Sequence, residues 1–203
     1  MAQLDCKHFS GYRPCGYEGP CNQKCLSYLP IQNYILIIHL EALGSVLRTT
    51  SILPAIKRKY PHSHITWITS APANQLLSPN PYIDQVLTLK LEDVLTLSAR
   101  EFDVGFVVDK SLKAAGVLKQ THCREVFGFV SDQNGKIIPA HPSAEELWQI
   151  GLSNHLKFFL NKKPETQLLI ESLDLGSYCR DSYQVFLTPQ EKQVIHARKK
   201  LWG

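Results

Sequence analysis

The sequence lacks any apolar run long enough to cross a membrane. A spanning helix needs roughly 18 or more consecutive apolar residues, and no stretch of the 203-residue chain reaches that length. The first residues also lack the charged region and the following apolar region of a signal peptide. These absences lead us to expect a cytoplasmic protein.

Long basic runs are absent too. The formal net charge is only +4, and no cluster of Lys and Arg is interleaved with aromatic residues, so nucleic acid is not expected as a partner. A glycine-rich G-x-G-x-x-G loop is missing as well, which argues against a dinucleotide site. A weakly anionic substrate or a membrane surface stays compatible with this composition.

The most informative stretch that is present covers residues 34–60. It opens with an uninterrupted apolar run at 34–38, which is typical of a strand buried on both faces of a parallel sheet. A turn at Gly44 follows, and then apolar residues recur at nearly helical spacing, with Pro54 inside the pattern. We therefore expect a helix that kinks or breaks at Pro54, and the whole stretch predicts the first half of a βαβ unit.

Strand and helix patterns continue to alternate along the chain. We expect strands at 64–69, 85–89, 103–108, 124–129 and 183–187, and helices at 71–77, 91–99, 111–120, 143–160, 165–173 and 190–201. This alternation predicts an α/β domain with a Rossmann-like, doubly wound parallel sheet. We assign residues 31–187 to this domain and residues 188–203 to a final helix.

Residues 1–30 have no periodic apolar pattern but hold four of the six cysteines. A segment this short and this rich in Gly and Pro cannot bury a core of its own and needs a cross-link. In a cytosolic chain, such a cluster is more often a metal site than a disulfide framework. The predicted ligands are Cys6, Cys15, Cys21 and Cys25.

The spacing C-x8-C-x5-C-x3-C does not decide which metal these cysteines bind. It fits neither the paired cysteines of common zinc ribbons nor the ferredoxin pattern, so Zn²⁺ and an iron–sulfur cluster are both open. Free thiols or disulfides are the alternatives. His8 is expected to be an exposed loop residue, and Cys123 and Cys179 are expected to be buried thiols.

The predicted sheet brings polar residues together at its carboxyl edge, where open α/β sheets bind ligands. The residues expected there are His39, Glu41, Gly44, Ser45 and Arg48 after the first strand, and Asp109, Lys110 and Ser111 after the fourth. Backbone N–H groups of a helix starting near Gly44 would face an anionic group. The alternative is that these residues only turn the chain and cap helices.

The order of the residues favours a ligand site. The sequence I-L-I-I-x-L-x-x-L-G-x-V-L-R-T-T-x-I-L-P-A-I-K-x-K-Y-P, followed by I-T-W-I-T and N-P-Y-I-D-x-V, resembles the N-terminal domain of the family-9 glycosyltransferases, the ADP-heptose:lipopolysaccharide heptosyltransferases and their relatives. The resemblance covers about residues 34–175. The cysteine-rich extension also resembles one found in front of a subset of this family.

The resemblance implies a GT-B-type enzyme in which two Rossmann-like halves face each other. The N-terminal half of such an enzyme binds the acceptor saccharide, and the C-terminal half binds a nucleotide-sugar donor such as ADP-heptose. Transfer proceeds by direct displacement, with a carboxylate as general base on the acceptor hydroxyl. The implied activity is transfer of a heptose or a related hexose to a lipopolysaccharide-core or similar saccharide, with peripheral contact at the inner face of the membrane.

The sequence departs from the family at two points. Where the family has Gly-Asp in the first turn, with that Asp as the proposed base, this chain has Gly44-Ser45. A serine hydroxyl alone cannot take a proton near neutral pH, so Glu41 and Asp109 are candidate bases beside Ser45. The predicted substrate-binding residues are Gly44, Arg48, Thr49 and Lys110.

The second departure is that nothing up to Gly203 matches the C-terminal motifs of the family. We therefore expect a chain without the donor-binding domain, in which the helix at 188–203 leads to that absent domain. Such a chain folds but transfers sugar poorly, because half of the reacting geometry is missing. Two alternatives follow. The chain is a non-catalytic saccharide-binding remnant, or it is a metal-cluster protein whose α/β domain serves as a scaffold.

Overall fold

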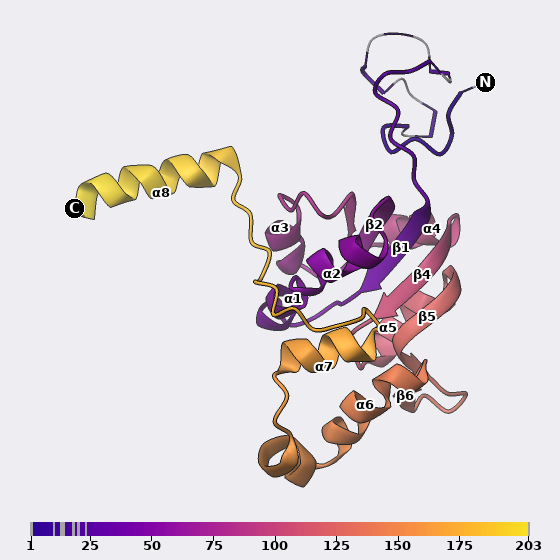
Figure 1. The fold of residues 1–203 in the computed structure, drawn as a ribbon, viewed down its shortest axis with the longest axis vertical. Coiled ribbons are helices and arrows are strands. Elements are labelled where there is room, and N and C mark those ends of the chain that lie inside the picture. The colour runs from indigo at the N-terminus through magenta and orange to yellow at the C-terminus, as the bar shows by residue number, and fades with distance from the viewer. Residues whose placement is uncertain are drawn as a thin grey trace.

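The computed structural model describes residues 2–202 except residues 10, 13, 14, 18, 20 and 23, and it leaves out the side chains of residues 200–202. Within this part of the chain, the centre is a six-stranded sheet in the order β3-β2-β1-β4-β5-β6 (Figure 1). The strands are β1 Asn33–Ile38, β2 Ser63–Ile68, β3 Gln85–Leu87, β4 Glu101–Val107, β5 His122–Ser131 and β6 Ile137–Pro139. Neighbouring strands from β3 to β5 pair in parallel, and only β6 runs antiparallel to β5.

Helices connect the parallel strands and flank the sheet (Figure 1). They are α1 Leu43–Thr49, α2 Ile52–Lys59, α3 Ala73–Leu77, α4 Leu91–Ser98, α5 Leu112–Lys119, α6 Glu145–Leu152, α7 Glu165–Ser172 and α8 Pro189–Trp202, with a 3-10 turn η1 at Pro142–Ala144 and a π-helix η2 at Leu156–Leu160. This arrangement confirms the predicted α/β class with a doubly wound, mostly parallel sheet.

Strand β1 explains why both sides of the sheet are covered. Its residues Ile35 and Ile37 belong to a core that includes buried residues of α1, α2 and α7, whereas Leu36 and Ile38 belong to a second core with residues of α4 and α5. All four side chains are fully buried. Burying one such side chain stabilises the fold by roughly 1.5–3 kcal/mol, so β1 contributes strongly to both cores.

The break after α1 lies earlier than predicted. The sequence predicts a kink at Pro54, but the helix ends at Thr49 and α2 begins at Ile52. The hydroxyls of Thr50 and Ser51 donate hydrogen bonds to backbone carbonyls one turn back, at 2.6 and 2.8 Å, which competes with continuing the helix. Pro54 then occupies the first turn of α2, where a missing N–H costs nothing.

Two further sequence predictions are wrong in detail. The helix expected at 143–160 is interrupted at Ser153 and continues as the π-helix η2. The segment 183–187 forms no strand, because the N–H of Gln184 donates to the Thr50 hydroxyl at 2.8 Å and its carbonyl accepts from the Asn80 amide at 2.9 Å. Side chains therefore hold this segment where a strand ladder was expected.

Helix termini follow their sequence signals more closely. The Ser111 hydroxyl accepts from the N–H of Ala114 at 3.2 Å, as expected for the cap of α5. At α8 the Thr188 hydroxyl accepts from the N–H of Glu191, whose carboxylate accepts from the N–H of Thr188 at 2.7 Å, a reciprocal capping box. In Figure 1, α8 extends away from the sheet; that it leads to a donor-binding domain stays a prediction, as do the predicted domain boundaries.

Candidate functional site

A pocket of about 210 Å³ lies at the carboxyl edge of the sheet, beyond the ends of β1 and β4. It gathers six of the seven predicted catalytic and substrate-binding residues, namely Glu41, Ser45, Arg48, Thr49, Asp109 and Lys110, with His39, Val108, Leu147, Glu165, Thr166 and Leu169. We call it the carboxyl-edge pocket. Gly44 is the exception, since it borders a different groove between α1 and α3.

Asp109 is held firmly by the sheet. The preceding residue, Val108, extends the pairing of β4 with β1, because its N–H donates to the carbonyl of Ile38 at 3.0 Å. The Asp109 Oδ2 atom then accepts from the N–H of Leu40 at 3.1 Å. The carboxylate is thus fixed between the ends of two central strands and lies half-buried at the pocket.

His39 is the most deeply buried titratable group in this pocket. Its side chain is 3% exposed, and within the described residues its Nδ1 atom has no hydrogen-bond partner. Burial lowers the pKa of His39, an effect that the nearby Asp109 carboxylate partly opposes. His39 therefore presents a neutral imidazole near pH 7 at the inner wall of the pocket.

The buried imidazole predicts a pH dependence of stability. Because the folded pKa is lowered, the unfolded chain binds more protons as the pH falls below 6.5, the ordinary histidine value. The free energy of unfolding is expected to be fully maintained above that pH and to decrease as the pH falls towards the folded pKa. Urea titrations between pH 7.5 and 5 should show a flatter profile for His39→Gln, whereas the exposed His122→Gln should keep the wild-type slope; equal slopes for all three proteins would contradict the argument.

An ion pair between Arg48 and Glu165 spans the pocket from α1 to α7. The Arg48 Nε atom lies 3.0 Å from Glu165 Oε2, and its Nη2 donates to Glu165 Oε1 at 3.3 Å. Both side chains are partly exposed, so the pair adds little stability. An anionic ligand entering the pocket would compete with Glu165 for the guanidinium group.

Lys110 supplies the other cation of the pocket. Although the residue is exposed as a whole, its ammonium lies 4.8 Å from the centroid of the Phe129 ring, and partial burial lowers its pKa. A cation over an aromatic face is held in place without a carboxylate partner. Lys110 is therefore placed to meet a polar or anionic group of a ligand.

Glu41 and Ser45 are held less firmly in the pocket than Asp109. The Glu41 carboxylate is 60% exposed and pairs with the Lys113 ammonium at 3.0 Å, which leaves it at the rim of the pocket. Ser45 lies in the first turn of α1, where its N–H donates to the carbonyl of Ala42 at 2.9 Å. Of the three predicted catalytic residues, Asp109 has the most rigid support.

Sequence reasoning missed one wall of this pocket. Leu147 on α6 and Glu165, Thr166 and Leu169 on α7 lie far along the chain from the strand ends that they face. Nothing local in the sequence signals this approach, because it depends on how α6 and α7 pack beside the sheet. Only the helical pattern of 165–173, without a partner assigned to it, pointed to a further layer.

The four predicted metal ligands lie elsewhere, around a pocket of about 350 Å³ in the N-terminal segment. Cys6 is buried, Cys25 is half-buried, and Cys15 and Cys21 are exposed. Among the described residues, no group of three or more His, Cys, Asp or Glu side chains is placed to hold a metal ion as it stands. The zinc or iron–sulfur site therefore stays a prediction. Cys179, predicted to be buried, is exposed, since it lies on the irregular segment before α8.

Comparisons with known proteins place the fold. No family model matches the sequence, and no curated protein matches it. The structure is similar to that of the glycosyl transferase family 9 protein from Veillonella parvula DSM 2008, with a TM-score of 0.58 and 17% identity over 83% of this chain and 49% of that chain. It is also similar to E. coli ADP-heptose LPS heptosyltransferase II, with a TM-score of 0.56 and 16% identity over 81% of this chain and 50% of that chain.

This chain spans about half the length of these solved structures. At such low identity the likeness concerns the fold and leaves activity, substrate and acceptor to be argued separately. None of the comparisons bears on the cysteine-rich segment. The chain therefore has the α/β fold found in GT-B glycosyltransferases of family 9.

Proposed function

We propose that this chain is the acceptor-binding half of a glycosyltransferase of the heptosyltransferase type. The observation that carries the proposal is the convergence of Ser45, Arg48, Asp109 and Lys110 in one pocket at the carboxyl edge of a family 9-like sheet. In open α/β sheets that edge is where ligands bind. The acceptor would be a lipopolysaccharide-core or similar saccharide, and the donor a nucleotide-sugar such as ADP-heptose, bound by a second half.

The chemistry of the carboxyl-edge pocket suits a saccharide acceptor. Arg48 and Lys110 offer cationic donors to anionic or hydroxyl groups, and the side chain of Thr49 lines the same wall. Asp109, with one carboxylate oxygen occupied by the Leu40 N–H, is the proposed base that removes the proton of the attacking hydroxyl. Leu147 and Leu169 supply apolar surface against the faces of a sugar ring.

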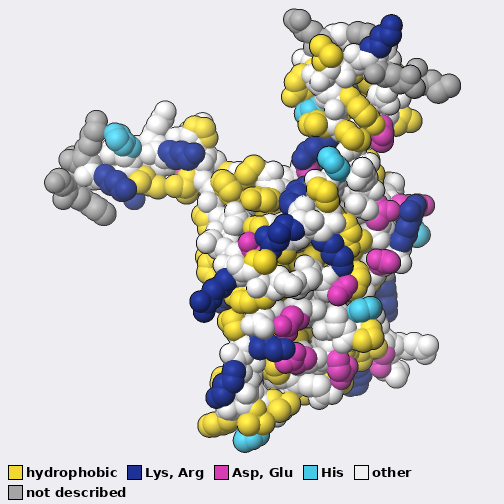
Figure 2. Space-filling view, in the orientation of Figure 1, with side chains coloured by type: hydrophobic (Ala, Val, Ile, Leu, Met, Phe, Trp, Pro, Cys, Tyr) yellow, Lys and Arg dark blue, Asp and Glu magenta, His cyan; other side chains and the backbone are white. Residues whose placement is uncertain are grey.

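Charge distribution accords with a small polar acceptor. Figure 2 shows Lys and Arg side chains interspersed with Asp and Glu over the visible face, and the net charge is only +4. A nucleic-acid partner would call for a continuous basic stripe. No helix in the described part of the chain is long and apolar enough to span a membrane; the cytoplasmic location and the peripheral contact with the inner membrane face stay predictions.

The proposal is tested by titrating the ¹⁵N-labelled chain with a deacylated lipopolysaccharide-core oligosaccharide. We expect amide shifts concentrated at residues of the carboxyl-edge pocket, and an affinity roughly tenfold to hundredfold weaker in Arg48→Ala, because a charged hydrogen-bond donor is lost. Arg124→Ala, on the exposed part of β5, is the matched control and should bind as the wild type does. Unchanged spectra, or shifts scattered over the surface, would reject the proposal.

A non-catalytic saccharide-binding remnant is the second candidate. It is favoured by Ser45, which stands where the resembled family has an aspartate. The two candidates share acceptor binding and differ in transfer. Acceptor binding without any product, after ADP-heptose and the donor-binding half have been supplied, would favour the remnant.

A further inference from the structure

The N-terminal segment is attached to the amino edge of the sheet, at the end opposite to the carboxyl-edge pocket (Figure 1). The N–H of Lys7 donates to the carbonyl of Leu29 at 2.7 Å, and the N–H of Ile31 donates to the carbonyl of Asp5 at 2.7 Å. The Lys7 ammonium also lies 2.6 Å from Asp84, just before β3. These contacts close residues 7–29 into one large loop with a defined base.

The described part of this loop buries little apolar surface. Phe9 and Tyr28 are half-buried beside its pocket, whereas Tyr12 is 99%, Leu26 103% and Leu29 49% exposed. Gly11 and Gly16 have positive φ angles of 89° and 83°, as expected of turns and not of regular structure. A loop of this length loses conformational entropy on ordering, and it has no hydrophobic core that would compensate the loss.

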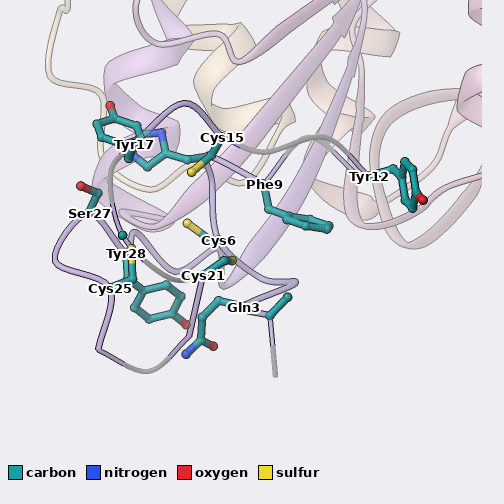
Figure 3. Close-up of a pocket in the computed structure, with 13 residues that line it drawn as sticks. Gln3, Cys6, Phe9, Tyr12, Cys15, Tyr17, Cys21, Cys25, Ser27 and Tyr28 are labelled. Atoms are coloured by element: carbon teal, nitrogen blue, oxygen red, sulfur yellow. The ribbon is translucent and has the colours of Figure 1, made fainter.

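The loop brings its four cysteine side chains around one pocket. Figure 3 shows Cys6, Cys15, Cys21 and Cys25 around the same space, and all four border the pocket of about 350 Å³. Each of them is a free thiol. These four cysteines are spread over residues 6–25 of the chain, so a single group bound by all of them would cross-link the whole segment.

Backbone hydrogen bonds fix two of the four cysteines. The carbonyl of Cys6 accepts from the N–H of Phe9 at 2.9 Å, and the N–H of Cys25 donates to the carbonyl of Asn22 at 3.0 Å. Cys6 also bridges to Pro30 at the base of the loop. Cys6 and Cys25 are therefore anchored, whereas Cys15 and Cys21 are exposed.

We propose that these four cysteines form a metal centre, which takes Zn²⁺ or an iron–sulfur cluster through four thiolates. Thiolates select soft metals over Mg²⁺ or Ca²⁺. Four thiols bind Zn²⁺ by releasing their four protons to solvent, and the metal forms four Zn–S bonds of about 2.3 Å. Among the described residues, no three such ligands are within reach of one metal ion, so binding requires the thiols of Cys15 and Cys21 to approach those of Cys6 and Cys25.

The centre acts as a structural cross-link and takes no part in sugar transfer, because it lies at the opposite edge of the sheet from Asp109 and Arg48. It is therefore independent of the proposed function. A chain that binds metal but no saccharide would refute the glycosyltransferase proposal alone, and the reverse result would refute the metal centre alone.

The test is elemental analysis and a visible spectrum of the untagged full chain, purified without oxygen. We expect either about one zinc per chain with no visible band, or about two to four iron with matching sulfide and a broad charge-transfer band. The double variant Cys21→Ser/Cys25→Ser should lose at least nine-tenths of the metal. Cys179→Ser, at an exposed thiol outside the loop, should keep all of it.

Thiol titration of the wild type gives a second readout that does not require the variant to fold. In the native holo-protein we expect four of the six cysteines to be protected from a thiol reagent, and released after chelation or denaturation. A metal-free chain with six reactive thiols would overturn the proposal. So would two disulfides within the loop, or full metal retention in the double variant.

Discussion

Gly128→Ala is expected to lower the free energy of unfolding by roughly 3–5 kcal/mol, which combines backbone strain with steric overlap. Gly128 has φ +92°, a conformation that residues with a Cβ atom rarely adopt. A Cβ there would lie 2.0 Å from the carbonyl oxygen and 2.9 Å from the carbonyl carbon of Val107. Both are backbone atoms of a central strand and cannot rotate away as a side chain would.

Thermal and urea unfolding measure this loss, and Gly116→Ala on α5 is the matched control. No atom lies within 4 Å of a Cβ built on Gly116, and alanine favours a helix over glycine by about 0.5–1 kcal/mol. The control should therefore be neutral or slightly stabilised. If Gly128→Ala unfolds at the wild-type midpoint, the close approach of β5 to β4 does not exist as described.

The same glycine links the fold to the candidate site. β5 pairs in parallel with β4 up to the position where Gly128 lies opposite Val107, and beyond it pairs antiparallel with β6. The carbonyl of Gly128 accepts from the N–H of Ala140 at 2.8 Å, which begins that switch. Because Val107 is two residues before Asp109, any displacement of this contact should also move the carboxylate in the pocket.

The sequence was sufficient for those parts of the fold that depend on local patterns. The apolar run at 34–38 predicts a strand buried on both faces, and Ile35, Leu36, Ile37 and Ile38 are all fully buried. Since a parallel sheet aligns the carboxyl ends of its strands, this strand also predicts that residues after β1 and β4 meet. That geometric rule is why Ser45, Arg48, Asp109 and Lys110 could be grouped without a structure.

Features that depend on competing interactions could not be predicted from the sequence. Thr50 and Ser51 end α1 through side-chain hydrogen bonds that outcompete the expected proline break. The segment 183–187 has strand-like residues, but its backbone partners are side chains of Thr50 and Asn80. Glu165 reaches Arg48 across 117 positions of chain. Such distant partners follow from how α7 packs and leave no periodic signal.

The choice of general base is the second point at which a large effect is expected. Under the proposed function, Asp109→Asn should lower kcat for sugar transfer by about 10²- to 10⁴-fold, the usual contribution of a positioned base. The asparagine oxygen can still accept from the N–H of Leu40, the hydrogen bond that holds Asp109 at 3.1 Å. Acceptor affinity should therefore change only a few-fold, so that the loss appears in kcat and not in KM.

Glu41→Gln is the control that separates the two carboxylates. Glu41 is largely exposed and neutralised by Lys113, and a solvated carboxylate at the rim makes a poor base for a hydroxyl bound deeper in the pocket. Its replacement should cost less than tenfold in kcat, within the range of a lost surface ion pair.

Rates are measured with ADP-heptose and the oligosaccharide acceptor, with the donor-binding half supplied. A larger loss in Glu41→Gln than in Asp109→Asn would transfer the role to Glu41, and small losses in both would leave the pocket as a binding site without a base. The decision depends on geometry: a base must be held against the substrate, and of the two carboxylates only Asp109 is fixed by the central strands of the sheet.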